Sequence, residues 1–208
     1  IASGKGGTGK TTVAANLAAS LDQAVTVLDC DVEEPNLHLF LHPEIHTREN
    51  VVAPIPRVNM EKCTLCKRCM EICRFNAIAV AGKTVVTFPE LCHSCGGCSA
   101  ICPEGAVTEM DRVLGIVETG TGPAPDMGFA QGLLDVGQVM VPPVIRKVKS
   151  HIDTQGITLI DAPPGTSCPV IAAMKDTDFV ILVTEPTPFG LNDLKLAVDT
   201  VRMMDIPH

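Results

Sequence analysis

The sequence contains no tryptophan and no tyrosine, and its six aromatic residues are all phenylalanine. Long apolar runs are also missing. The longest stretches, such as Phe179–Val183, have the length of a strand, whereas a membrane-spanning helix needs about 20 residues. Lysine and arginine form no large cluster, and the net charge is −8. These absences exclude a membrane-spanning protein and argue against nucleic acid as the main partner.

The composition is that of a folded protein with an unusual number of cysteines. Hydrophobic residues make up 46% of the 208 residues, and the 17 glycines and 16 prolines are ordinary numbers, which excludes disorder and collagen-like repeats. There are ten cysteines. No signal peptide opens the sequence, so we interpret the cysteines as ligands in a reducing cytoplasm rather than as disulfides.

Both ends of the sequence interrupt a pattern. Ile1 is not an initiator methionine, and only Ile1–Ser3 precede a glycine-rich turn that normally follows a strand of about five residues. At the other end, an amphipathic helix stops at Pro207–His208, where an alternating pattern would continue into a strand. We therefore expect a fragment that is truncated at both ends.

Alternating helix and strand patterns predict an α/β fold. Val13, Leu17 and Leu21 mark one face of a helix over 10–21, and Val25–Leu28 follows as a buried strand. The alternation resumes later with a strand at 157–160, a helix from 169 to 174, a strand at 179–184 and a helix at 191–204. We predict a parallel sheet with helices on both faces.

Residues Gly4–Thr11 fit the phosphate-binding pattern G-x-x-x-x-G-K-[ST] at the opening of the first helix. Such a loop turns consecutive backbone N–H groups and a helix N-terminus toward phosphate oxygens. Lys10 then neutralises charge on the β- and γ-phosphates, and the Thr11 hydroxyl is offered to Mg²⁺. The residues expected to bind nucleotide in this P-loop are Gly6, Gly7, Thr8, Gly9, Lys10, Thr11 and Thr12.

A second lysine, Lys5, gives the loop the form K-G-G-x-G-K-[ST]. In this the sequence resembles the MinD/ParA ATPases with a deviant Walker A motif, a group related to the nitrogenase iron protein and the Mrp-type ATPases. The resemblance covers residues 1–56 and 116–208. It implies ATP or ADP with Mg²⁺ as ligands. It also implies an ATP-dependent homodimer in which Lys5 is catalytic and reaches the phosphates of the opposite protomer.

Two strand ends carry further motifs of this group. By resemblance, Asp31 is the switch I aspartate. Asp161 opens a sequence like the switch II motif D-x-P-x-G, in which it holds the Mg²⁺ shell and the Gly165 amide senses the γ-phosphate. The expected catalytic residues are therefore Lys5, Lys10, Asp31 and Asp161. The lysines and Mg²⁺ would stabilise phosphoryl charge during in-line attack by water.

Eight of the ten cysteines form an internal repeat. The spacing C-x2-C-x2-C-x3-C occurs at Cys63–Cys73 and again, 29 residues later, at Cys92–Cys102. The repeat resembles bacterial two-cluster ferredoxins, in which the fourth cysteine of each copy serves the other cluster. This resemblance implies two 4Fe-4S clusters, one held by Cys63, Cys66, Cys69 and Cys102, the other by Cys92, Cys95, Cys98 and Cys73. Residues 57–115 would then form a small α+β ferredoxin domain inserted into the P-loop fold.

Other interpretations of the cysteines stay open. Paired C-x2-C motifs also hold zinc, although the two x3 gaps favour iron–sulfur. The first copy has Arg74 where the ferredoxin pattern has proline, which changes the surroundings of one cluster without removing a ligand. We expect Cys30 to be a small buried side chain in the core. Cys168 is either a structural or redox-sensitive thiol or part of a cluster shared between protomers.

The favoured function is an ATPase that couples nucleotide-driven dimer switching to electron transfer through two 4Fe-4S clusters, with a redox partner protein. The alternatives are an iron–sulfur scaffold or carrier ATPase and a MinD-like spatial regulator with a redox-sensing module. The regulator would contact a membrane only through an amphipathic helix beyond residue 208. An amidating ligase of the cobyrinic acid diamide synthase type shares the core, but no glutaminase domain is present. Because the chain is acidic, we expect its redox partner to present a basic docking face.

Overall fold

The computed structural model describes residues 1–124 and 126–208, and the chain falls into two compact units. The first unit comprises Ile1–Val51, Gly115–Leu134 and Val141–His208. The second unit comprises Val52–Leu114 and Asp135–Met140. The second unit therefore begins five residues before the predicted insertion and includes a short second segment.

Within the described residues, the main sheet has five strands in the order β2-β5-β6-β1-β7. These are β1 (Val25–Asp29), β2 (Glu44–Val58), β5 (Val107–Thr121), β6 (Met127–Leu134) and β7 (Ile157–Asp161). β1 pairs in parallel with β6 and with β7, whereas β5 pairs antiparallel with β6. The predicted α/β fold is confirmed, but the sheet is only mostly parallel. The connection between β5 and β6 is too short for the crossover that a parallel pair requires.

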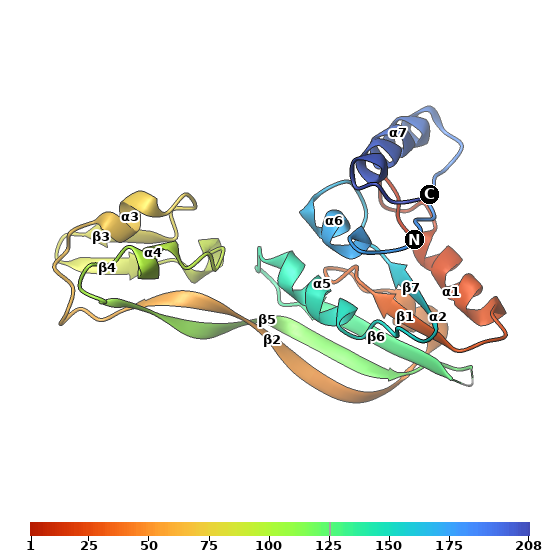
Figure 1. Ribbon diagram of the computed structural model, residues 1–208, viewed down its shortest axis with the longest axis horizontal. Coiled ribbons are helices and arrows are strands. Elements are labelled where there is room, and N and C mark those ends of the chain that lie inside the picture. The colour runs from red at the N-terminus through yellow and green to blue at the C-terminus, as the bar shows by residue number, and fades with distance from the viewer. Residues whose placement is uncertain (125) are drawn as a thin grey trace. The chain divides into compact units, whose positions relative to one another are not determined.

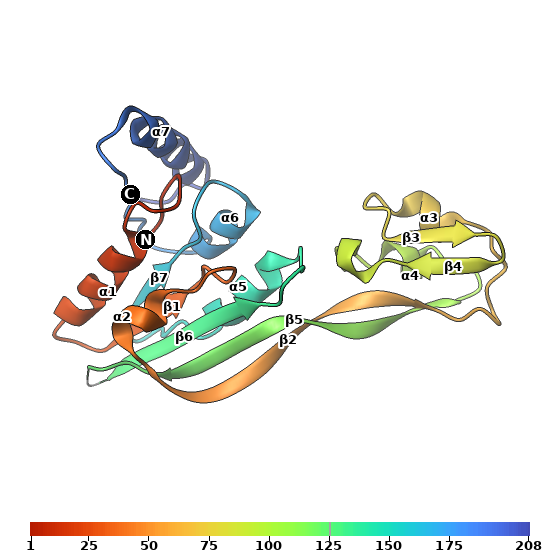
Figure 2. The same ribbon diagram turned by 180° about the vertical axis from the view of Figure 1, so that it is seen from behind.

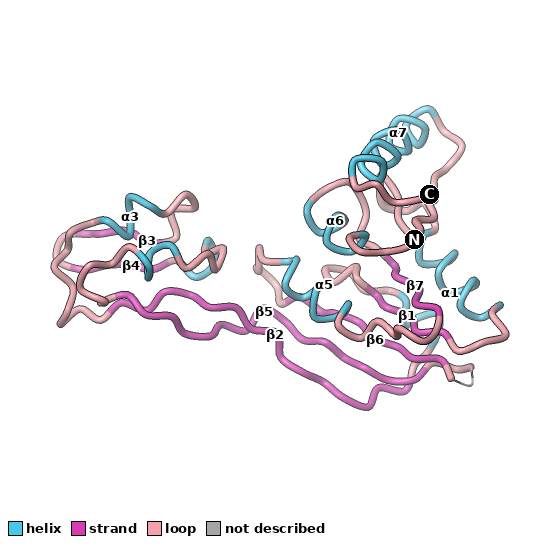
Figure 3. Tube along the Cα trace, viewed as in Figure 1, coloured by secondary structure: helices cyan, strands magenta, loops and turns pink. Residues whose placement is uncertain are grey.

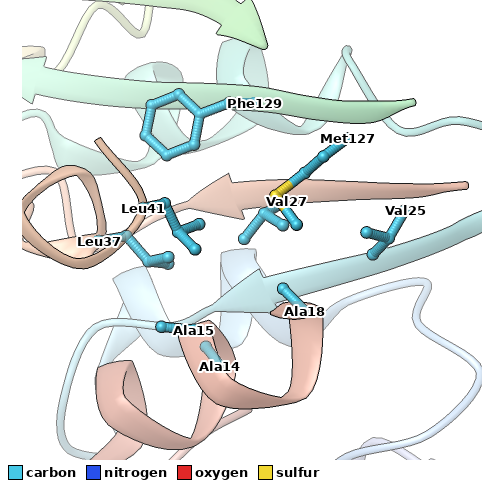
Figure 4. Packing of buried hydrophobic residues seen from close by; sticks show 9 residues of the cluster. All are labelled: Ala14, Ala15, Ala18, Val25, Val27, Leu37, Leu41, Met127 and Phe129. Carbon is cyan, nitrogen blue, oxygen red and sulfur yellow. The ribbon is translucent and has the colours of Figure 1, made fainter. Parts of the chain in front are cut away.

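Helices cover both faces of the sheet around β1 and β6. α1 (Lys10–Ser20) and α2 (Leu37–Leu41) pack on one face, against alternate residues of β1 and β6 (Figure 4). α5 (Val141–Lys149) packs on the other face, where a Cβ added to Gly132 would lie 2.9 Å from side-chain atoms of Val144 and Val148. Figures 1 and 2 show α1 and α5 on opposite sides of β1 and β7. The core under α1 consists of Ala14, Ala15, Ala18, Val25, Val27, Leu37, Leu41, Met127 and Phe129.

The C-terminal part of the first unit departs from prediction at one place. α6 (Cys168–Met174) and α7 (Pro188–Met203) form where helices were predicted, but residues 179–184 do not form a full strand. Two backbone hydrogen bonds of 2.9 Å join this segment to Ala2, and Leu182 makes an isolated parallel bridge with it. The predicted strand was wrong for the described residues, in which this segment pairs with Ala2 alone and forms a single bridge instead of a ladder.

The long strands β2 and β5 were not predicted from the sequence. Both cross the boundary between the two units, and Figure 3 shows each of them as a long strand. β2 contains Pro54 and Pro56, which lack backbone donors and argue against a strand when the sequence alone is considered. Its first seven residues are exposed, so the alternating apolar pattern of a half-buried strand is missing there.

The second unit contains two copies of the same backbone arrangement. Its elements are the hairpin of β3 (Ile78–Ala81) and β4 (Thr84–Thr87), the helices α3 (Arg68–Ile72) and α4 (Gly97–Ala100), and the short 3-10 helix η1 (Pro89–Leu91). α3 and α4 start 29 residues apart, which is the offset of the cysteine repeat. Positive φ angles recur at this offset in the pairs Leu65 and Ser94, Lys67 and Gly96, and Asn76 and Gly105. The sequence repeat is therefore also a structural repeat.

The longest helix in the described part of the chain is α7, with 16 residues. Across residues 1–124 and 126–208, every helix falls short of the length and hydrophobicity that a membrane span requires.

Candidate nucleotide site and cysteine cavities

The glycine-rich loop that opens α1 has a backbone that only glycine adopts easily at two positions. Gly7 and Gly9 have φ angles of 76° and 91°, and Gly9 directly precedes α1. A Cβ on Gly4 would lie 2.2 Å from the Asp193 carbonyl oxygen, so glycine is also required where the loop approaches α7. The loop thus presents backbone donors at the N-terminus of an 11-residue helix, an arrangement suited to phosphate.

Buried polar atoms around this loop fit a phosphate and a divalent cation. The Lys10 side chain is buried, with 6% of the residue exposed, and within the described residues it makes no ion pair. Thr8 Oγ1 and Asp161 Oδ1 are buried without a hydrogen-bond partner. Buried polar atoms are normally hydrogen-bonded, so these atoms indicate a ligand. An ammonium, a hydroxyl and a carboxylate form a donor set that matches phosphate oxygens with Mg²⁺.

Three aspartates meet at the carboxyl ends of β1 and β7. Parallel pairing places Asp29 directly beside Asp161. Burial raises the pKa of Asp29 to about 7 and the pKa of Asp31 to about 6, and the nearby Asp161 charge acts in the same direction on both. Burial also raises the pKa of Asp161, although the Thr11 hydroxyl and the Lys10 charge oppose this. A bound cation would favour the ionised form of these clustered carboxyls.

Asp29 was missed as a site residue when the sequence was considered alone. Its side chain is fully buried and accepts three backbone hydrogen bonds of 3.0 Å, from the N–H groups of Asp31, Asn36 and Leu37. It therefore anchors the loop that carries Asp31. The sequence signal was the pair of aspartates around Cys30, but nothing in it showed which aspartate turns inward.

Lys5 contacts an acidic residue of its own chain. Its ammonium forms an ion pair with Glu185, and the Thr187 hydroxyl donates a 2.8 Å hydrogen bond to the same carboxylate oxygen. Thr187 is also the N-cap of α7, where its side chain accepts from the Gly190 N–H. The pair is half-buried and joins the P-loop to the start of α7. Glu185 was also missed, because it lies 180 residues from Lys5 in the sequence.

Three other residues that were expected to contact the nucleotide, Gly165, Thr12 and Asp31, differ in their burial and hydrogen bonding. The Gly165 amide donates to the Ser3 carbonyl at 3.0 Å, so it is bound to the start of the P-loop. Sensing a γ-phosphate with this amide would require the bond to be exchanged. Thr12 is exposed on the first turn of α1, and Asp31 is half-buried.

In the second unit, the eight repeat cysteines surround two cavities. The first cavity is lined by Cys63, Cys66, Cys69 and Cys102. The second cavity is lined by Cys73, Cys92, Cys95 and Cys98. Each cavity takes three cysteines from one copy of the repeat and the fourth from the other copy. The structure thus brings together the two sets that the ferredoxin resemblance implies.

Backbone donors point at the fourth cysteine of each copy. Ala77 N–H donates to Cys73 Sγ, and Ala106 N–H donates to Cys102 Sγ, each at 3.3 Å. Burial acts to raise the pKa of the Cys102 thiol, but hydrogen bonds from the backbone at residues 104–107 outweigh it and lower this pKa. These donors favour the thiolate, which is the form of cysteine that binds metals.

The third cysteine of the first copy, Cys69, is the most buried of the eight repeat cysteines. Cys69 is buried with Ile78 and Val107 in a small apolar cluster, against which Cys98 also packs. Burial raises the pKa of the Cys69 and Cys98 thiols. A cationic metal centre favours the thiolate in such a place, so the donor set of each cavity fits a group held by four cysteines.

The two remaining cysteines lie in the first unit. Cys30 is completely buried beside Asp29, and burial raises the pKa of its thiol. Cys168 is exposed at the start of α6. All ten cysteines are free thiols. Across the part of the chain that is described, no group of three or more His, Cys, Asp or Glu side chains is arranged to hold a single metal ion.

Comparison with known proteins identifies the family. Residues 1–207 match the CobQ/CobB/MinD/ParA nucleotide binding domain. The chain belongs to this family. The predicted relation to the MinD/ParA group is confirmed, and the P-loop lies in a nucleotide-binding domain.

Relatives of this CobQ/CobB/MinD/ParA domain span its whole length. An uncharacterized protein of Methanocaldococcus jannaschii is 32% identical over 213 residues, which cover 100% of this chain and 74% of that protein. The iron-sulfur cluster carrier protein of the same organism is 28% identical, with coverage of 100% and 56%. The fold is similar to that of the septum site-determining protein MinD of Pyrococcus horikoshii, solved with Mg-ADP, at a TM-score of 0.52 and 23% identity. The chain spans 65% of that MinD chain.

Replacing Asp29 by asparagine should destabilise this domain. An asparagine side chain has one acceptor oxygen, so one of the two groups of N–H donors around Asp29 would face an amide NH2. We expect Asp29→Asn to lower the free energy of unfolding by about 1–3 kcal/mol, measured by chemical denaturation. Asp31→Asn is the matched control, and an equal loss in both variants would contradict the anchoring role of Asp29.

Proposed function

We propose that this family member binds and hydrolyses Mg-ATP as a dimer and couples the resulting switch to electron transfer through two 4Fe-4S clusters. The observation that carries the proposal is the division of eight cysteines between two four-cysteine cavities, in a chain that also contains a complete P-loop. A nucleotide-binding domain alone does not require these thiols. Their arrangement supports a second, metal-based chemistry in the same chain.

On the nucleotide side, each residue has a separate task. Lys10 and the loop N–H groups neutralise phosphate charge, and Thr11 and Asp161 hold the Mg²⁺ shell. Asp31, whose N–H donates to the Asp29 carboxylate, would orient water or metal. Lys5 is the catalytic lysine that reaches across the dimer, and this requires its ion pair with Glu185 to open. Release of Lys5 would therefore accompany dimer formation.

On the cysteine side, the chain supplies ligands and a small apolar cluster beside them. A 4Fe-4S cluster held in each cavity supplies one-electron transfer. The thiolates of each set hold the group from two copies of the repeat, so neither cavity is complete without both copies. Backbone N–H groups of Ala77 and Ala106 stabilise negative charge on sulfur, and Ile78 and Val107 exclude water from the inner face.

A second candidate function is transfer of assembled clusters to other proteins. The similarity to the iron-sulfur cluster carrier protein of Methanocaldococcus jannaschii favours it. Four cysteines around each cavity describe groups that are retained rather than released, which favours electron transfer. The two functions differ in one measurable property, because a carrier loses its iron to an apo-acceptor protein whereas an electron carrier keeps it.

Lys10→Ala should separate the two sites. Removing the buried ammonium should weaken binding of Mg-ADP by about 100-fold, since a charged contact to phosphate is lost. The anaerobically purified variant should retain eight iron atoms per chain, because Lys10 lies outside the unit that holds the cysteines. Calorimetry and iron analysis check both values. Loss of iron together with nucleotide binding would contradict the assignment of the iron to the cysteine cavities of the second unit.

Lys5→Ala should separate binding from hydrolysis. The variant should bind Mg-ADP within about threefold of the parent but hydrolyse ATP at least about tenfold more slowly, because a charge that stabilises the transition state is removed. Glu185→Gln is the matched control, since it breaks the same ion pair and leaves the lysine in place. Its turnover should equal or exceed that of the parent. Full turnover by Lys5→Ala would exclude Lys5 as a catalytic residue.

A further inference from the structure

The acidity of the chain is confined to the first unit. Of the 16 lysines and arginines, seven lie in the second unit, and of the 24 aspartates and glutamates, seven also lie there. With its cysteines counted as neutral and no group bound, the second unit has no net formal charge, and the formal net charge of −8 belongs to the first unit. The overall charge thus gives no guide to what docks on the cysteine unit, and the charges at the cavities decide instead.

The two cavities differ in their borders. Lys67 and Arg68, both exposed, line the first cavity together with Glu104. The second cavity has Glu109 as its only charged lining residue within the described chain. An aromatic pair also borders the second cavity, where Phe75 and His93 stack with ring centroids 3.7 Å apart and an interplanar angle of 14°. One cavity is thus bordered by positive charge and the other by an aromatic stack.

The repeat shows that these positive charges are not needed to build a cavity. Residues 62–74 contain four basic residues and one acidic residue, whereas the matching residues 91–103 contain no Lys, Arg, Asp or Glu. Lys67 has a φ of 66°, and its counterpart Gly96 has a φ of 71°. Glycine adopts this conformation without strain, and lysine does not. A lysine at such a position is a local conflict of the kind that accompanies function.

We propose that the basic rim formed by Lys67 and Arg68 at the first cavity is the docking surface for an acidic one-electron carrier protein. This inference rests on the proposed function. In the transfer, one electron leaves the reduced carrier, which is thereby oxidised, and the group ligated at the first cavity is reduced by that electron. No covalent bond forms or breaks. The partner therefore presents an acidic face to this unit, in place of the basic face predicted from the total charge.

Charge complementarity selects a protein of this class. Opposite charges around a buried redox group steer the approach of a partner and bring its own redox group close, mainly by raising the association rate. A nucleic acid would need a longer basic surface, and apart from Lys67 and Arg68 this unit has five basic and seven acidic residues. Cys66, which also lines the first cavity and directly precedes Lys67 in the sequence, is exposed.

The test uses the whole chain, reconstituted anaerobically, with a reduced acidic flavodoxin as the probe. Stopped-flow absorbance measures the second-order rate of electron transfer at low and at high salt. We expect Lys67→Gln combined with Arg68→Gln to lower the low-salt rate about tenfold and to weaken its salt dependence. Lys67→Gly, which copies Gly96 and relieves the strained φ, should show a smaller fall in the same direction. The affinity between the oxidised chain and oxidised flavodoxin, measured by calorimetry, should also fall in both variants.

The matched control is Arg57→Gln combined with Lys83→Gln. It removes two exposed positive charges from the same unit at positions that line neither cavity, and it should leave the rate within about twofold. The iron content of the unmodified chain is measured first. If that chain does not hold eight iron atoms, the proposed function itself is wrong. If both double variants hold their iron and lose rate equally, or if neither loses rate, the docking surface is wrong and the proposed function stands.

Discussion

The parallel pairing of β1 with β7 is the constraint on which the nucleotide site depends. It sets Asp29 and Asp161 side by side at buried strand ends, close to the buried Lys10. Burial raises the pKa of both carboxyls, so the site concentrates acidic groups that are costly to ionise. A bound divalent cation would relieve this cost. Asp29 also anchors the loop that carries Asp31. A ligand that changes the charge at these strand ends would therefore also affect the conformation of this loop.

The second unit depends on a different constraint, the exchange of the fourth cysteine between two copies of one backbone. Cys73 and Cys102 each line the cavity of the other copy, and each accepts a backbone N–H bond of 3.3 Å. The copies share geometry but differ in charge, with Lys67 in one at the position of Gly96 in the other. The two cavities therefore have similar backbones, but the charged residues around them differ, so they present different surfaces to a partner.

Local chemistry could be predicted from the sequence, and contacts between distant residues could not. The loop Gly4–Thr11 and the two cysteine spacings were recognisable because their chemistry needs neighbouring residues. The ion pair of Lys5 with Glu185 joins residues 180 positions apart, so no local pattern signals it. The predicted strand at 179–184 was wrong because strand formation depends on pairing with a distant segment, and here the pairing is confined to Ala2. β2 was missed because its prolines and exposed first half resemble a loop.

The central claim is that the nucleotide site and the cysteine cavities are energetically coupled. The most direct test is a redox titration of the holoprotein, purified without oxygen, in the absence of nucleotide, with MgADP and with a non-hydrolysable MgATP analogue. Coupling predicts that the analogue shifts at least one cluster potential, and a shift of about 60 mV for one electron corresponds to about 1.4 kcal/mol between the sites. By reciprocity, reduction would then change nucleotide affinity about tenfold. Identical potentials in all three states would contradict the account.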